Sequence, residues 1–358
     1  MAGKIPVIVI SGFLGSGKTT LLNRLLASAR AAGQAEVQDR TVVLVNELGA
    51  VSLDHERYMS LGSRLVLLES GCICCAVHGD LVDTLRQLFL DALHRKIPPF
   101  SMLLIETTGM ADPAPVMHTL QYDRFLADRY RYAGCLTVVD GEHGTGQLQQ
   151  HPEALQQVAL ADVLAISKSD QVGPAHLSVL RQALQGLNPA APVCLTQDLP
   201  GLDAMPAMLA EHAWRKPVRF GASLWSGSTM SQRKTAHAGV GVLIVKWDKC
   251  WVRSASMRAL PELLGRLGTG LLRLKGRVFF NGDSHASVLH AVHQHLYPIE
   301  AVESSLPGEP GFDKDPLSGA SVLLFIYRDL EESRLLELVH DLLPGGMKIL
   351  SPDGNFIQ

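Results

Sequence analysis

The stretch IPVIVISGFLGSGKTTLLNRLL, at residues 5–26, decides the fold. It joins a short β-branched run, a glycine-rich loop and a helical pattern with one apolar face. The loop, residues 12–19, matches G-x-x-x-x-G-K-T at every fixed position. This strand–loop–helix setting separates a phosphate-binding loop from a chance glycine-rich turn. The stretch therefore predicts a P-loop α/β domain that binds a nucleoside triphosphate.

Each residue type in the loop has a task in holding a triphosphate. Gly12, Gly15 and Gly17 let the backbone turn its amides toward the phosphates, and the helix N-terminus adds the positive end of its dipole. We expect Lys18 to reach the β and γ phosphates and the Thr19 hydroxyl to ligate Mg²⁺. The predicted nucleotide contacts in this loop are Gly15, Ser16, Gly17, Lys18, Thr19 and Thr20.

Another apolar run, residues 101–105, ends in a carboxylate, Glu106, and Thr107-Thr108-Gly109 follow it. An acid at such a strand end suits a second Mg²⁺ contact, direct or through water. Gly109 can let the backbone approach the γ-phosphate, where a switch loop senses hydrolysis. The alternative for Glu106 is an ordinary strand-end carboxylate.

Ser167-Lys168-Ser169-Asp170 follows a further apolar run, residues 163–166. A Lys-x-Asp at such a strand end is typical of GTPases, in which the carboxylate accepts from N1–H and the exocyclic amine of guanine. Adenine lacks this donor pair and would leave the carboxylate unpaired. We therefore expect Lys168 and Asp170 to contact the base and to favour GTP over ATP.

Three thiols fall within four residues, at Cys72, Cys74 and Cys75. The first two share a face of an extended segment, and the third joins them if the chain turns near Gly71. Thiolates select Zn²⁺, Co²⁺, Cu⁺ or iron over Mg²⁺, and three of them leave one tetrahedral position open, which suits transfer. The alternatives are buried small hydrophobic residues and a redox dithiol, although thioredoxin-like spacing is missing.

Two other groups of polar residues are candidates. Glu47, in Asn46-Glu47-Leu48-Gly49, lies where a switch segment is expected and could ligate a metal or orient the attacking water; a solvated loop carboxylate is the alternative. Residues 285–296 are predicted as a helix, with two histidines spaced to share a face. A surface helix explains them without a metal site. The histidines of this stretch are His285, His290, His293 and His295.

Short apolar runs alternate with helical patterns up to about residue 196. Because most of these runs are continuous, they predict strands buried on both faces of a mainly parallel sheet. The predicted strands are 5–10, 41–45, 64–68, 102–105, 135–139, 163–166 and 192–195, and helices are predicted after Lys18, Gly79, Pro113 and Pro174.

A second, smaller pattern follows residues 217–238, which are rich in Ser and Gly and which we interpret as a linker. It has predicted strands at 241–247, 271–281 and 321–327 and predicted helices at 261–267, 285–296 and 330–343. The predicted organisation is a P-loop domain with the cysteine motif at 1–216, the linker at 217–238, and an α+β domain at 239–358.

The formal net charge of −3 over 358 residues gives no reason to expect nucleic acid or an acidic membrane surface as a partner. No apolar run reaches the length of a membrane span. The apolar N-terminus leads directly into the phosphate loop, so we interpret it as a strand rather than a signal peptide. Six cysteines without a disulfide pattern then favour the reducing cytoplasm.

The motifs and their order resemble the CobW family of P-loop GTPase metallochaperones, whose nucleotide-binding domain is of the CobW/HypB/UreG type. The sequence LLRLKG at 271–276 looks like the start of a strand in that family's C-terminal domain, so the resemblance covers nearly the whole chain. It implies GTP-dependent delivery of zinc or cobalt to a client protein, in some members nitrile hydratase. The other motifs that carry it are residues 12–20, 46–49, 71–75, 106–113 and 139–140.

Three features depart from the family pattern. The base-reading motif begins with Ser167 where Asn is usual, which predicts weaker discrimination for guanine. Ala50 stands where members often carry Glu, so one switch carboxylate is absent. The histidine-rich run of many members is also absent, which argues against a large metal store.

The sequence thus predicts a cytoplasmic, Mg²⁺-dependent, slow GTPase that loads Zn²⁺ into a client, with Lys18, Glu47 and Glu106 as its catalytic residues. Two alternatives are a regulator that holds zinc and nucleotide without productive turnover and a cobalt chaperone. Metal-stimulated GTP hydrolysis separates the first of these from a chaperone. An ATP-dependent kinase lacks a visible acceptor site. The client, and whether the chain forms a homodimer, are left open.

Overall fold

The chain divides into two compact units in the computed structural model. One comprises Met1–Ala183 with Ala191–Ala213, and the other Leu184–Ala190 with Trp214–Gln358. The predicted linker at 217–238 lies outside the residues that the structure describes. Those residues are 3–45, 64–67, 77–212, 239–283, 285–301, 320–350 and 356–357.

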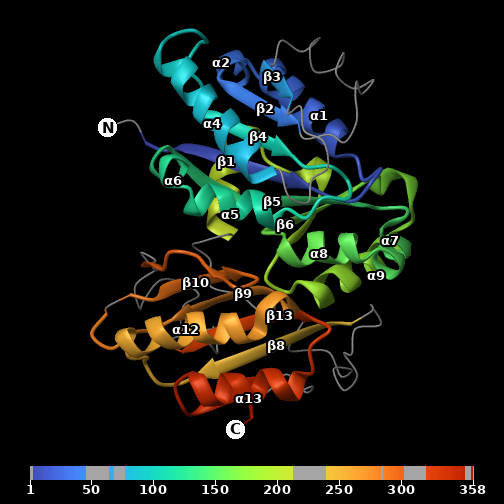
Figure 1. Cartoon of the computed structure of the whole chain (residues 1–358). Helices are drawn as coiled ribbons and strands as arrows, with labels where there is room; N and C mark the ends of the chain where they lie inside the picture. Colours follow the sequence, from blue (N-terminus) through green and yellow to red (C-terminus); the bar gives the residue numbers. More distant parts are fainter. Residues whose placement is uncertain are drawn as a thin grey trace. The chain divides into compact units, whose positions relative to one another are not determined.

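The first unit is built on a seven-stranded sheet in which every neighbouring pair is parallel (Figure 1). Its order, β3-β2-β4-β1-β5-β6-β7, confirms the predicted P-loop α/β class. The strands are β1 Ile5–Ser11, β2 Thr41–Val45, β3 Arg64–Leu67, β4 Met102–Glu106, β5 Tyr130–Asp140, β6 Val163–Ser167 and β7 Val193–Leu195.

The continuous apolar runs form these strands because the sheet is covered on its faces. Leu22 and Leu26 of α1 pack with β1 and with Leu209 of α10 in one hydrophobic cluster. Helices α4, α5 and α6 contact one another as a second group. The helices of this part are α1 Lys18–Ala31, α2 Ala35–Asp39, α4 Val77–Leu93, α5 Ala114–Tyr122, α6 Arg124–Arg129, α7 Gly144–Gln150, α8 Pro152–Leu160, α9 Pro174–Leu187 and α10 Met205–Ala210.

The second unit is an antiparallel eight-stranded sheet with two long helices. Helices α12 and α13 pack together, and their leucines share a core with Trp247 and Trp251, whose rings meet edge to face at 5.0 Å. The elements are β8 Val240–Trp247, α12 Arg253–Leu267, β9 Leu271–Val278, β10 Ser287–Val292, β11 His295–Leu296, β12 Glu300–Ala301, β13 Ser321–Arg328, α13 Glu332–Leu342, β14 Met347–Leu350 and β15 Phe356–Ile357.

The predicted helix at 285–296 is wrong, because this stretch forms β10 and β11. Pairing of β10 with β9 places Leu289 and Ala291 in the core, with His290 between them. His293 lies in the turn after β10 with φ 50°, so His290 and His293 do not share a helical face. A short apolar run fits a strand or a helix by periodicity, and here the pairing with β9 decides.

Several predicted bounds also differ from the observed ones. Helix α12 begins at Arg253 and carries Pro261 inside it, although the sequence suggested a start at that proline. Helix α13 begins at Glu332 rather than at residue 330, and β9 ends at Val278 rather than at 281. Among the helices of the described residues, none has both the length and the apolar character that a membrane span needs.

Candidate functional site

The phosphate loop connects β1 to α1, as its sequence predicts. Gly12 has φ 143°, and a Cβ at this position would lie 2.3 Å from the carbonyl oxygen of Val138. Gly17 caps α1 in the left-handed conformation, with φ 91°. Both conformations are readily available only to glycine. The loop therefore brings the N-terminus of α1 to the carboxyl end of the sheet, where α/β proteins of this kind bind phosphates.

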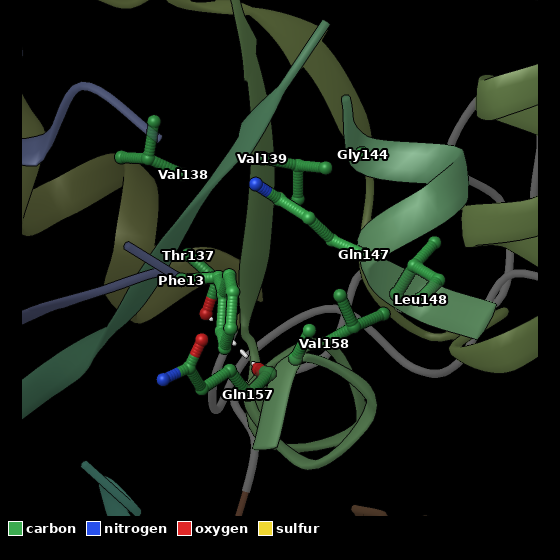
Figure 2. Close-up of a pocket in the computed structure, with 10 residues that line it drawn as sticks. Phe13, Thr137, Val138, Val139, Gly144, Gln147, Leu148, Gln157 and Val158 are labelled. Carbon is green, nitrogen blue, oxygen red and sulfur yellow. Dashed lines mark hydrogen bonds between the residues drawn. The ribbon is translucent and has the colours of Figure 1, made fainter. Parts of the chain in front are cut away.

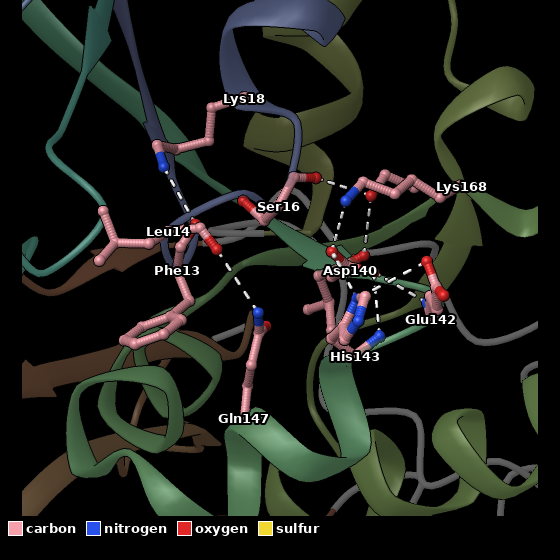
Figure 3. Close-up of polar contacts among 11 residues, drawn as sticks. Phe13, Leu14, Ser16, Lys18, Asp140, Glu142, His143, Gln147 and Lys168 are labelled. Carbon is pink, nitrogen blue, oxygen red and sulfur yellow. Dashed lines mark hydrogen bonds and ion pairs between the residues drawn. The ribbon is translucent and has the colours of Figure 1, made fainter.

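Lys18 is the first residue of α1, and its side chain folds back over the loop. The buried Nζ atom donates to the carbonyl oxygens of Gly12, at 2.8 Å, and Phe13, at 3.2 Å (Figure 3). Two hydroxyl oxygens, Ser16 Oγ and Thr108 Oγ1, are buried and have no hydrogen-bond partner among the described residues. Buried polar groups are rarely left unpaired, so these hydroxyls fit the oxygens of a bound Mg²⁺–triphosphate.

The predicted Mg²⁺ ligands are adjacent. Glu106 ends β4, which pairs with β1 in the centre of the sheet, and its Oε1 accepts from the Thr19 hydroxyl at 2.9 Å. A hydroxyl and a carboxylate beside the phosphate loop are the oxygen ligands that Mg²⁺ takes in P-loop proteins. The sequence placed these two residues 87 positions apart, and the sheet brings them together.

The segment after Glu106 lies directly against the phosphate loop. A Cβ at Gly109 would lie 2.7 Å from the backbone nitrogen and 2.8 Å from the Cα atom of Leu14. Leu14 and the neighbouring Met110 are both 53% exposed. Since any side chain at position 109 would clash with the loop, this close approach requires glycine. Gly109, the predicted switch position, is thus next to the phosphate loop.

The predicted base-reading residues follow β6. Asp170 is exposed in a short 3₁₀ turn, Ser169–Gln171, and Lys168 precedes it with φ 50°. The Ser167 hydroxyl donates to the carbonyl oxygens of Ser16, at 2.6 Å, and Val139, at 3.3 Å. Ser167, which stands where the family pattern led us to expect Asn, therefore connects the predicted base-reading segment to the phosphate loop.

Asp140 is a residue to which the sequence gave no role. It ends β5, and its Oδ2 lies 2.6 Å from Lys168 Nζ, while Oδ1 accepts from the backbone N–H of Glu142 and of His143 (Figure 3). Burial on its own would raise the pKa of Asp140, but these three hydrogen bonds outweigh it and lower the pKa below its ordinary value. A strand-end Asp in the sequence was the available signal.

The predicted transition-metal ligands Cys72, Cys74 and Cys75, and the carboxylate Glu47, lie outside the described residues. Within the described part of the chain, no group of three or more His, Cys, Asp or Glu could hold a metal ion. The segments that contain these candidates begin after β2 and β3, which run parallel to β1 and β4. Those strands therefore end at the same sheet edge as the phosphate loop and Glu106.

Two of the C-terminal histidines, His290 and His293, make contacts within the second unit. His290 is buried, and its ring lies 4.8 Å from that of Tyr297. His293 Nδ1 is 2.9 Å from the carbonyl oxygen of Leu271. Burial, together with the charge of His293, lowers the pKa of His295. These positions do not assemble a metal-ligating group in the region described here.

A small pocket lies beneath Phe13 of the phosphate loop (Figure 2). Its volume is about 10 Å³, at the lower limit for one water molecule, so it holds no substrate. It is lined by residues of the loop, β5, α7 and α8, among them Phe13, Thr137, Val138, Gln147 and Gln157.

The parallel sheet, the glycine-rich loop and the Thr19–Glu106 contact define a P-loop nucleotide-binding protein. Within that class the chain belongs to the CobW family. Residues 6–195 match the CobW/HypB/UreG nucleotide-binding domain, and residues 248–343 match the cobalamin synthesis protein cobW C-terminal domain.

Two curated proteins illustrate the relationship. The zinc chaperone YjiA of Escherichia coli is 32% identical over 301 residues, which are 83% of this chain and 88% of YjiA. The zinc-regulated GTPase metalloprotein activator 1 of Schizosaccharomyces pombe is 32% identical over 200 residues, 54% of this chain and 46% of that protein. A structure of Zn(II)-bound YjiA GTPase from E. coli shares the fold, with a TM-score of 0.67 and 24% identity over 96% of this chain and 100% of that one.

Proposed function

We propose that this protein is a GTP-dependent metallochaperone that hydrolyses GTP slowly with Mg²⁺ and delivers Zn²⁺ to a client protein. The observation that carries the proposal is the hydrogen bond between Thr19 and Glu106 beside a complete phosphate loop. The names of its relatives, a zinc chaperone and a zinc-regulated GTPase activator, support the choice of cargo and nucleotide.

The nucleotide would be held by residues of the first unit. We assign Lys18 to the β and γ phosphates, and Thr19 and Glu106 to Mg²⁺, which when bound would neutralise charge on the phosphates. We propose Glu47 to orient the attacking water, because it follows β2 by two residues and β2 ends at the same edge as the phosphate loop.

We propose GTP rather than ATP as the nucleotide. The exposed carboxylate of Asp170 is available to accept from N1–H and the exocyclic amine of guanine, and the stem of Lys168 can cover the base. Lys168 is held by its ion pair with Asp140, which fixes the segment before a base arrives. Adenine would leave the Asp170 carboxylate unpaired.

We propose that the cargo binds at Cys72, Cys74 and Cys75. Three thiolates suit Zn²⁺ and leave one coordination position for a ligand of the client. Cobalt fits the same donors, so both ions are compared in the hydrolysis experiment.

We assign residues 1–216 to nucleotide and metal binding and 239–358 to a separate C-terminal domain, and we place the reaction in the cytoplasm. The same experiment tests whether the working form is a homodimer.

The proposal is tested by metal-dependent hydrolysis. We expect the purified full-length chain to convert GTP to GDP and phosphate with Mg²⁺, slowly, and faster with Zn²⁺ or Co²⁺ added. The matched variant Cys72→Ser/Cys74→Ser/Cys75→Ser should keep the Mg²⁺-dependent rate and lose the stimulation. Gel filtration with each metal reports the oligomeric state. Zinc and GTP binding without any turnover would instead identify a regulator.

A further inference from the structure

The segment that follows Glu106 is held by one helix. Gln157 of α8 donates through its Nε2 to the carbonyl oxygens of Gly109, at 3.2 Å, and Ala111, at 3.0 Å. The preceding residue, Gln156, donates to Asp112 Oδ2 at 2.6 Å. Two adjacent glutamines thus fix three of the four residues from 109 to 112.

Gln157 is itself held in place. Its side chain is 1% exposed, and its backbone carbonyl oxygen accepts from the Thr137 hydroxyl of β5 at 3.1 Å. Its Oε1 has no hydrogen-bond partner among the described residues. Because water cannot replace the lost contacts at a buried site, moving Gly109 away from Gln157 leaves buried polar groups unpaired. The hydrogen bonds of the Gln157 side chain therefore depend on the position of the backbone at Gly109 and Ala111.

The pair of helices α7 and α8, which meet at His151, also contacts the phosphate loop. Gln147 of α7 donates to the carbonyl oxygen of Leu14 at 3.4 Å (Figure 3). The His151 ring stacks on Phe13, with centroids 4.5 Å apart and planes 26° apart. Figure 2 shows Phe13 and Gln157 side by side at the small pocket. The α7–α8 pair is thus bound to the loop and to residues 109–112 at once.

We propose that Gln157 is a positioning residue that makes the site prefer the triphosphate over the diphosphate. The proposal rests on binding of the triphosphate at the phosphate loop, as proposed above. Gly109 contacts both Leu14 and Gln157, so its backbone is held next to the phosphate loop by a side chain of α8. A γ-phosphate contact at Gly109 forms at low cost only when Gln157 already holds that backbone in place.

A purely structural role for Gln157 makes a different prediction. A residue that only satisfies two buried carbonyl oxygens stabilises the fold, and its loss weakens GTP and GDP binding alike or lowers the melting temperature alone. A positioning residue changes the ratio of the two affinities, because a ligand shifts an equilibrium only through differential interaction with its states. The ratio of the GTP and GDP dissociation constants therefore separates the two roles.

The experiment titrates the full chain with a non-hydrolysable GTP analogue and with GDP, both with Mg²⁺, by calorimetry. In Gln157→Leu and Gln157→Met, neither of which has a group that can donate to the carbonyls, we expect analogue affinity to fall roughly tenfold, equivalent to about 1.4 kcal/mol. GDP affinity should change by less than about twofold. The control Gln150→Leu makes the same exchange at an exposed site on α7 and should leave both affinities unchanged.

Equal losses for both nucleotides, or none, in variants that melt like the wild type would overturn the inference. If both Gln157 variants fail to fold, Gln156→Ala tests the same link through Asp112 and should lower the analogue-to-GDP affinity ratio several-fold; an unchanged ratio there also overturns it. A wild-type chain that binds neither nucleotide would refute the proposed function and this inference together. Wild-type binding with an unaffected ratio in the variants refutes this inference alone.

Discussion

At the residue scale, the ammonium group of Lys18 is buried at the start of α1, where it donates to two carbonyl oxygens of the phosphate loop. Lys18→Ala removes the cation that we assign to the β and γ phosphates, so we expect Mg²⁺–GTP affinity to fall by on the order of 100-fold. Calorimetric titration measures the Mg²⁺–GTP dissociation constant of variant and wild type. Lys4→Ala, at an exposed position before β1, is the control. A variant that binds GTP like the wild type contradicts the loop assignment.

Asp170 sets the choice of base in our proposal. Asp170→Asn presents an amide that suits the N1 and C2 groups of xanthine better than those of guanine. We expect the preference of the variant to move from GTP toward XTP. The wild type should prefer GTP to ATP, but by a smaller factor than a GTPase that has Asn at position 167. Competition among the three nucleotides measures the order, and Asp128→Asn, exposed on α6, is the control. Equal wild-type affinity for GTP and ATP would sink the assignment.

The ion pair between Asp140 and Lys168 contributes stability that depends on pH. Because the pKa of Asp140 is lowered in the folded state, its contribution is present above the unfolded pKa, about 4, and is lost as pH falls through the lower folded value. Asp140→Asn should cost about 1–2 kcal/mol at pH 7. Urea unfolding measures the free energy of unfolding of wild type and variant, and the difference between them should narrow toward pH 3. A difference that widens there contradicts the pairing.

At the element scale, the close approach of the segment after β4 to the phosphate loop depends on Gly109. Gly109→Ala places a methyl group against the backbone of Leu14, so one of the two segments must shift. We expect triphosphate affinity to fall at least tenfold. Gly146→Ala, in α7 with nothing near its Cβ, is the matched control and should stabilise the protein by about 0.5–1 kcal/mol. Unchanged GTP binding in Gly109→Ala would remove Gly109 from the site.

The elements that the sequence predicted best are those whose environment is uniform. Strands such as β2 and β4 are buried along their whole length, so their apolar runs were unbroken and their bounds came out within one residue. Short helices such as α7 and α8 were not predicted, because their apolar residues face β5 and the phosphate loop, which sequence spacing does not reveal. The prediction of a helix at residues 285–296 was wrong because only pairing with β9 makes Ser287–Val292 a strand.

At the scale of the whole molecule, the candidate site is assembled from distant segments. Lys18, Thr19 and Glu106 could be picked out because each occupies a strand end or a loop with a known pattern, and the structure brings Thr19 and Glu106 into hydrogen-bond contact. The roles of Asp140 and Gln157 were missed because they arise from contacts with Lys168 and with the Gly109 carbonyl. The strand-end position of Asp140 was visible in the sequence, but a single sequence does not show which residue such a side chain contacts.

A metallochaperone driven by GTP must couple metal binding to the state of its nucleotide. Strands β2 and β3 end at the sheet edge that carries the phosphate loop, and the chain continues from them into the segments that hold Glu47 and the three thiols. Rearrangement around a γ-phosphate at that edge should therefore alter metal affinity. We expect Zn²⁺ to bind more tightly with Mg²⁺–GTP than with GDP, by about 5–150-fold, and Zn²⁺ to tighten GTP binding by the same factor.

This linkage is measured by competing the protein with a zinc chelator in the apo, GTP-analogue and GDP states, and by titrating nucleotide with and without Zn²⁺. Replacing Cys72, Cys74 and Cys75 by Ser should abolish the difference in zinc affinity between the nucleotide states. GTP binding should stay largely intact, since the phosphate loop is unchanged. The control Cys250→Ser, at an exposed thiol of the second unit, should keep the difference in zinc affinity. Zinc affinities that agree within error across the three states would mean that nucleotide does not drive transfer, because a ligand without differential affinity shifts no equilibrium.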